Sequence, residues 1–102
     1  MIKNKCLSCD DVLRTLREHQ TDLRGFGLKS LAVFGSTARN EASAQSDIDM
    51  LVEFALPVGL FRFLDLKAYL EELLGRSVDL VTPDALRRQL REGILKEAVH
   101  AL

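Results

Sequence analysis

The chain has 102 residues, a length that allows one domain. Hydrophobic residues make up 47% and charged residues 28%, a globular composition that excludes disordered, collagen-like and membrane classes. The formal net charge of −1 gives no reason to expect direct binding of nucleic acid. No apolar run reaches the ~18 residues that span a bilayer, and the N-terminus lacks the apolar core of a signal peptide. We therefore expect a cytoplasmic protein without membrane contact.

The first predicted helix ends near Gly25. Ser8 followed by Asp11 is the pattern of a capping box at a helix start. Apolar residues then recur at helical spacing, at Val12, Leu13, Leu16 and Leu23.

Two cysteines, Cys6 and Cys9, form a C-x-x-C motif at the start of this helix. A redox motif of this kind follows a strand, and a zinc site would need two more ligands, for which the sequence offers only His19 and His100. Neither condition is met, so we expect ordinary thiols in a reducing compartment and assign the histidines no role.

Three segments are predicted to be strands. Residues 31–34 form a short apolar run that ends at Gly35, which suits a strand buried on both faces. Residues 47–54 begin as polar/apolar alternation, so that two aspartates share one face of the strand. Residues 78–81 form the third strand.

Two further helices complete the pattern. Residues 60–74 are predicted to be a helix that stops at Gly75, with a wide apolar arc around Phe61, Phe63, Leu66 and Tyr69. Core packing and docking of a partner explain this arc equally well. Thr82, Pro83 and Asp84 are typical of a helix start, and this helix is expected to reach the C-terminus with a bend at Gly93. The order of elements predicts an α/β sheet covered by helices.

The chemistry is predicted to lie in one motif, in which Gly35 and Ser36 are followed by ten residues and then by Asp47-x-Asp49. Two residues of strand span ~6.6 Å, so the two carboxylates project from one face and can bind metal ions ~3.5–4 Å apart. Hard oxygen ligands suit Mg²⁺, which takes further ligands from substrate phosphates. The predicted substrate is therefore a nucleoside triphosphate.

The residues after the first strand are expected to bind its phosphates. Gly35 lacks a Cβ, which lets phosphate oxygens approach the backbone. Ser36 offers a hydroxyl and is expected to cap a short helix that begins at Thr37, whose N-terminus attracts anions. Arg39 is expected on the first turn of that helix, where it can bind a phosphate through two hydrogen bonds.

A third carboxylate has two candidates. Glu53 shares a face with Asp49 but lies ~13 Å along the strand, too far to share a metal ion. Asp79 is favoured, because a charge inside an apolar strand is costly unless a nearby metal ion compensates it. It could bind the metal or act as the base toward an acceptor hydroxyl. Pairing with an arginine or a backbone amide is the competing explanation.

The segment GSTARNEASAQSDIDMLVEF, with VDLVTPDALRRQL further on, resembles the minimal nucleotidyltransferase (MNT) domain of the DNA polymerase β-like superfamily. The similarity is greatest to antitoxin members encoded beside a HEPN-domain ribonuclease toxin. It covers the chain from about Ser8, so residues 1–102 are expected to be a single minimal nucleotidyltransferase domain. Asn40 departs from the pattern, since these proteins usually have glycine there.

The resemblance implies a small mixed sheet of about three to four strands, two Mg²⁺ ions and transfer of a nucleoside monophosphate from ATP to a hydroxyl. It makes Gly35 and Ser36 the phosphate-binding pair, Asp47 and Asp49 metal ligands, and Asp79 the third carboxylate. In the antitoxin branch it implies that a tyrosine of the partner toxin is adenylylated within a hetero-oligomer, which blocks RNA cleavage.

Two other functions remain open. The chain could neutralise its toxin by occluding it without catalysis, or it could transfer AMP to a small-molecule hydroxyl. The second alternative usually needs a further domain for the acceptor, and 102 residues leave none. Arg87, Arg88 and Arg91 are expected to form a solvated helix face rather than a ligand clamp.

Overall fold

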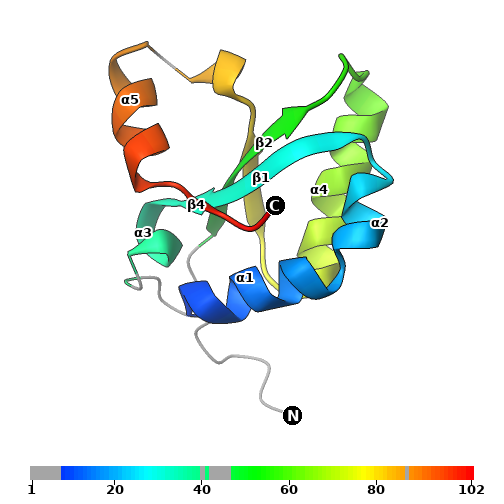
Figure 1. Ribbon diagram of the computed structural model, residues 1–102, viewed down its shortest axis with the longest axis horizontal. Helices are drawn as coiled ribbons and strands as arrows, with labels where there is room; N and C mark the ends of the chain where they lie inside the picture. The colour runs from blue at the N-terminus through cyan, green and yellow to red at the C-terminus, as the bar shows by residue number, and fades with distance from the viewer. Residues whose placement is uncertain (1–7, 40, 42–46, 87) are drawn as a thin grey trace.

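A mixed four-stranded sheet forms the centre of the computed structural model, which describes residues 8–39, 41, 47–86 and 88–102 (Figure 1). The strand order is β3-β2-β1-β4. The strands are β1 (Leu28–Phe34), β2 (Ile48–Phe54), β3 (Val78–Val81) and β4 (Val99–His100). The strand β1 pairs antiparallel with β2 and β4, whereas β2 and β3 are parallel. The predicted mixed sheet is confirmed.

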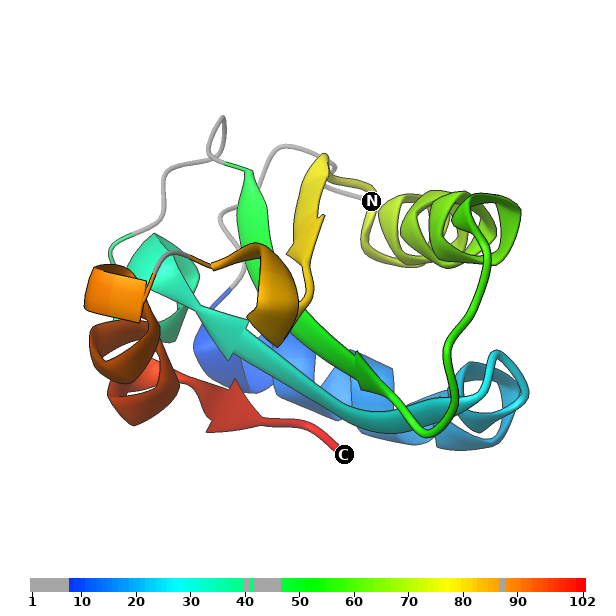
Figure 2. The ribbon, with the colours of Figure 1, turned by 90° about the horizontal axis from the view of Figure 1, so that it is seen from above.

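The helices lie in two groups. They are α1 (Cys9–Glu18), α2 (Gln20–Arg24), α3 (Gly35–Ala38), α4 (Leu60–Leu74), the 3₁₀ helix η1 (Pro83–Ala85) and α5 (Arg88–Glu97). Figures 1 and 2 show α3 and α5 together at one end of the sheet, far from α4. The core is made with α1, α2 and α4, whose buried apolar side chains pack on one face of the sheet.

Alternation along the strands decides which face carries which side chains. Ile48, Met50 and Val52 of β2 point into the core, as do Val78 and Leu80 of β3. The residues between them, which include two of the predicted site aspartates, therefore belong to the opposite face of the sheet. We call this opposite face the second face.

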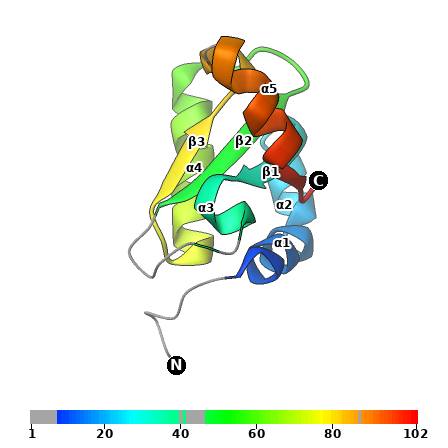
Figure 3. The same ribbon diagram turned by 90° about the vertical axis from the view of Figure 1, so that its left-hand side faces the viewer.

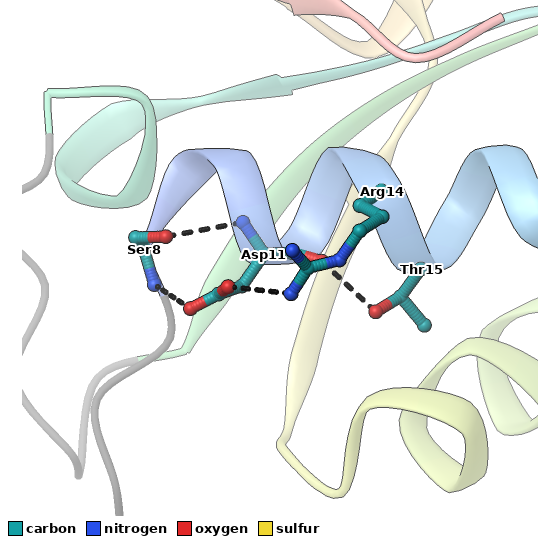
Figure 4. A network of polar contacts seen from close by, with 4 residues as sticks. All are labelled: Ser8, Asp11, Arg14 and Thr15. Carbon is teal, nitrogen blue, oxygen red and sulfur yellow. Dashed lines mark hydrogen bonds and ion pairs between the residues drawn. The ribbon is translucent and has the colours of Figure 1, made fainter.

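The N-terminal helix begins as predicted. The Asp11 amide donates to the Ser8 hydroxyl at 3.1 Å, and the Ser8 amide donates to the Asp11 carboxylate at 3.3 Å (Figure 4). Arg14 adds an ion pair to Asp11 at 2.9 Å. One helix was expected as far as Gly25, but the structure has two that meet at His19. The His19 amide there donates to the Leu16 carbonyl, three residues back, which ends the regular α-helical pattern.

The C-terminal region differs most from the prediction. Thr82 makes no side-chain cap, and the helix predicted from this point is instead the 3₁₀ turn η1 followed by α5. The helix α5 runs through Gly93 and ends at Glu97, and the chain then forms β4. Arg17 of α1 holds this last segment by donating to the His100 carbonyl at 3.1 Å and the Ala101 carbonyl at 3.3 Å.

Within the described part of the chain, every helix is too short or too polar to cross a bilayer.

Two glycines allow a test of the helix boundaries. Gly75 ends α4 in the left-handed region at φ +65°, which costs any other residue about 1 kcal/mol. Gly93 lies inside α5, and a Cβ there would meet nothing within 4 Å. We expect Gly75→Ala to lower the free energy of unfolding by about 1 kcal/mol and Gly93→Ala to raise it by about 0.5–1 kcal/mol. Urea denaturation measures both, and changes of the same sign would contradict these boundaries.

Candidate active site

The parallel pairing of β2 and β3 brings two predicted site residues together. In its register Asp49 lies opposite Asp79, and both side chains belong to the second face. Asp49 is half-buried, whereas Asp79 and Asp47 are exposed. Burial raises the pKa of the Asp49 carboxyl, and the negative charges of Asp79 and Asp47 raise it further. The three carboxylates therefore form one electrostatic group.

The prediction that Asp79 is a buried charge is wrong. Val78 and Leu80 on either side are buried, but Asp79 points away from the core on an edge strand. Apolar neighbours in the sequence therefore do not show that the carboxylate between them is buried. What distinguishes Asp79 is its neighbour Asp49, because two like charges side by side are unfavourable without a compensating cation.

Gly35 directly follows β1 and adopts φ +73°, a conformation that favours glycine. A Cβ on Gly35 would lie 2.2 Å from Oδ2 of Asp49 and 3.3 Å from its Cβ. The expected reason for glycine was the approach of a phosphate to the backbone. The structure shows a nearer reason, since the Asp49 side chain lies directly against this turn.

The short helix after β1 exists, but its start differs from the prediction. The helix α3 has four residues and begins at Gly35, with Phe34 at the cap position. Ser36 therefore lies inside the first turn and does not cap the helix, which corrects the expectation. A helix this short also gives little dipole to attract an anion. Ser36 stays half-buried next to Gly35 at the turn that meets Asp49.

Arg39, at the end of α3, has two acidic partners that the sequence did not indicate. Its Nε donates to Glu41 at 3.4 Å, and its Nη1 pairs with Glu97 at the end of α5. The positive charge of Arg39 also lowers the pKa of Asp49, opposing the larger effects of burial and of the two aspartates. Glu97 is 58 residues away in sequence, so no local pattern links the two residues.

The carboxylates fit Mg²⁺ by their chemistry. In the ranges that the structure describes, no three His, Cys, Asp or Glu side chains lie close enough to form a complete protein cage for a metal ion. Mg²⁺ does not need such a cage, because it keeps several waters and binds one or two carboxylates together with substrate phosphates. Asp47, Asp49 and Asp79 provide such carboxylates, and Asp49 lies opposite Asp79 on the neighbouring strand.

The other residues considered in the sequence analysis lie outside the group of three carboxylates. Glu53 is exposed, pairs with Lys29 at 3.8 Å and lies further along β2, as expected. Arg91 donates to the Pro83 carbonyl at 2.8 Å, so it joins α5 to η1 rather than forming a solvated face.

Cys9 is buried, and burial raises the pKa of its thiol. Cys6, Asn40 and Arg87 lie outside the described residues.

A cavity of about 560 Å³ lies at the opposite end of β2. Its lining includes Phe54 and Pro57 after the strand, Phe63 of α4, and Pro83 and Asp84 of η1. Its lining includes Glu53, the third-carboxylate candidate that the sequence analysis set aside, but none of Asp47, Asp49 and Asp79, so the carboxylate group is not part of this cavity.

Comparison with known proteins identifies the family and the fold. The model of the nucleotidyltransferase domain family matches residues 12–101. The protein adenylyltransferase MntA of Thermococcus cleftensis is 39% identical over 95 residues, which cover 92% of this chain and 96% of that protein. A solved structure described as a candidate minimal nucleotidyltransferase is 40% identical, with a TM-score of 0.77 and coverage of 91% of this chain and 95% of that one.

More distant structures share the fold. A toxin–antitoxin structure with AMP-PNP has a TM-score of 0.67 at 22% identity, covering 94% of this chain and 73% of that one. A Shewanella oneidensis structure of a tri-AMPylated HEPN toxin with an MNT antitoxin has a TM-score of 0.63 at 20% identity. The match covers 88% of this chain and 71% of that one.

Family and fold together therefore identify the chain as a nucleotidyltransferase. The chain belongs to the nucleotidyltransferase domain family and is a homologue of the protein adenylyltransferase MntA.

The electrostatics of Asp49 predict a stability change. Because folding raises the pKa of this acid, its ionised form opposes folding at neutral pH, and this cost vanishes as the pH falls through the folded-state pKa. We expect Asp49→Asn to raise the melting temperature by a few degrees at pH 7 in EDTA, and the gain to shrink toward pH 4.

The matched control for this measurement is Glu53→Gln, which changes an exposed carboxylate on the same strand and face. We expect no comparable gain from it. A melting temperature of Asp49→Asn at or below that of the wild type at pH 7 would show that the aspartates do not repel one another.

Proposed function

We propose that this chain is a Mg²⁺-dependent adenylyltransferase that moves AMP from ATP to a tyrosine hydroxyl of a HEPN-domain toxin, and so acts as its antitoxin. The observation that carries this proposal is the Asp49–Asp79 pair next to the Gly35 turn. The MntA homologue is named a protein adenylyltransferase, and fold neighbours include complexes of HEPN toxins with MNT antitoxins. The neighbour with AMP-PNP supports ATP as the substrate.

Each site residue has a role in this reaction. Gly35 and Ser36 would hold the triphosphate, with Arg39 at the end of the same helix as a further phosphate ligand. Asp47 and Asp49 would bind two Mg²⁺ ions, which when bound neutralise charge on the phosphates. Asp79 would complete the metal ligands or accept the proton of the tyrosine hydroxyl. The tyrosine oxygen forms its bond to the α-phosphorus as the bond to the β-phosphate breaks, and pyrophosphate leaves.

The proposed partner has a candidate docking surface on this chain. Of the apolar arc expected on α4, Leu66 is buried, and Phe63 and Tyr69 pack against the core, so only Phe61 is available. Phe61 is 83% exposed, and the side chains of Leu56, Leu60 and Leu64, at the start of α4 and in the turn before it, are exposed as well. We call these four residues the α4 patch. Exposed apolar patches of this kind often bind a partner protein.

A transfer assay tests the proposed activity. The chain is incubated with ATP, Mg²⁺ and a HEPN-domain toxin from the same genome, and the toxin is analysed by mass spectrometry. We expect the toxin to gain the mass of AMP on a tyrosine, and we expect no gain with Asp47→Ala/Asp49→Ala or with EDTA. An unmodified toxin, or a gain that persists in the double variant, would overturn the proposal.

Occlusion without catalysis is distinguished by stoichiometry. A catalyst protects RNA from the toxin at a small molar fraction of the toxin, whereas a non-catalytic binder needs equimolar amounts. Consumption of ATP with a small hydroxyl compound in place of the toxin would favour the small-molecule alternative.

The α4 patch predicts where the toxin binds. We expect Phe61→Asp to weaken the complex at least tenfold without unfolding the chain, because an exposed side chain contributes little to the core. The matched control is Leu95→Asp, which alters an apolar side chain of α5 that is also exposed. Pull-down and calorimetric titration measure both variants, and equal binding by Phe61→Asp and wild type would rule out docking at the patch.

A further inference from the structure

Arg39 follows α3 and joins this helix to α5 through an ion pair with Glu97. Its Nε contacts Glu41 at 3.4 Å, and its Nη1 contacts Glu97 (Figure 3 shows α3 beside α5). The Glu97 side chain is 29% exposed, and that of Glu41 is 65% exposed. Glu97 is therefore the more sheltered partner, while Glu41 lies at the protein surface.

Among the described residues, Arg39 forms no ion pair with the site aspartates. Arg39 directly follows α3, the helix that begins at Gly35, and the Asp49 side chain lies against Gly35. An arginine near a carboxylate can form a two-hydrogen-bond pair with it. Within the described residues, however, the ion pairs of Arg39 are with Glu41 and Glu97 alone. Glu41 and Glu97 therefore occupy the guanidinium, and neither Asp49 nor Asp79 is paired with it.

This arrangement also leaves donors for a ligand. A guanidinium has five N–H donors, and the contacts above engage Nε and Nη1. The two N–H groups of Nη2 have no partner among the described residues. They belong to a side chain that starts at the end of α3, the helix that begins with Gly35 and Ser36.

We propose that Glu97 is a positioning residue for nucleotide binding: it fixes Arg39 so that Nη2 can bind the triphosphate while Asp49 and Asp79 remain open to metal. This inference rests on the proposed function, because it requires that Mg²⁺-ATP binds at the carboxylates. It also gives α5 a role, since the helix carries Glu97 back to the turn after β1.

The expected effect is on nucleotide binding rather than on folding. Half-exposed ion pairs contribute little to stability, so the melting temperature of Glu97→Gln should stay close to that of the wild type. Loss of a fixed Arg39 should weaken binding of Mg²⁺-ATP roughly five- to tenfold, with kcat nearly unchanged. Glu97→Asp keeps the charge and should recover part of the affinity. Glu41→Gln is the matched control and should bind like the wild type.

A double-mutant cycle decides whether Glu97 acts through Arg39. Calorimetry with Mg²⁺-ATP compares the wild type, Arg39→Ala, Glu97→Gln and the double variant. We expect the double variant to bind no more weakly than Arg39→Ala alone, because the contact is already lost there. Unchanged binding by Glu97→Gln would overturn the proposal. So would a double variant whose two losses multiply, because Glu97 would then act independently of Arg39.

The binding readout separates this inference from the proposed activity. If the wild type binds Mg²⁺-ATP but modifies no acceptor, the proposed transfer fails while the cycle still reports on Glu97. If the wild type does not bind Mg²⁺-ATP, both proposals are overturned.

Discussion

The candidate site depends on the parallel pairing of β2 and β3. This pairing sets Asp49 opposite Asp79, and apolar burial on the other face fixes its register. Ile48 and Met50 of β2 and Val78 of β3 are almost fully buried. A slip by one residue would move these side chains out of the core and the aspartates into it, which the core does not permit. The hydrophobic face of the sheet therefore maintains an unfavourable pair of charges on the second face.

The turn after β1 is adapted to this pair. Gly35 takes a left-handed conformation, and the Asp49 carboxylate occupies the space where a Cβ would lie. Asp49 is thereby held against the turn and partly shielded from water, which raises its pKa. The clustered negative charges at this point oppose stability, as is common where a site serves a ligand. The glycine thus positions a carboxylate in addition to any contact with phosphate.

The C-terminal part of the chain stabilises the same end of the molecule. The helix α5 returns Glu97 to Arg39, and Arg91 of the same helix joins it to η1. After α5 the chain pairs with β1, where Arg17 of α1 holds the carbonyl groups of His100 and Ala101. The strand β1 therefore lies between β2, which carries Asp49, and a short C-terminal strand, so both ends of the sequence support the strand that leads into Gly35.

The sequence alone determined the elements whose signals are local. The helix α4 and its end at Gly75, the capping box at Ser8 and the strand β3 follow from neighbouring residues, and the structure confirms them. Tertiary structure decided the rest: the exposure of Asp79, the partners of Arg39, and the strand β4. The periodicity of a sequence shows which residues of one element share a face. It cannot predict a strand of two residues such as β4, or an ion pair between Arg39 and a glutamate 58 positions away. Both form only when segments that are distant in sequence pack together.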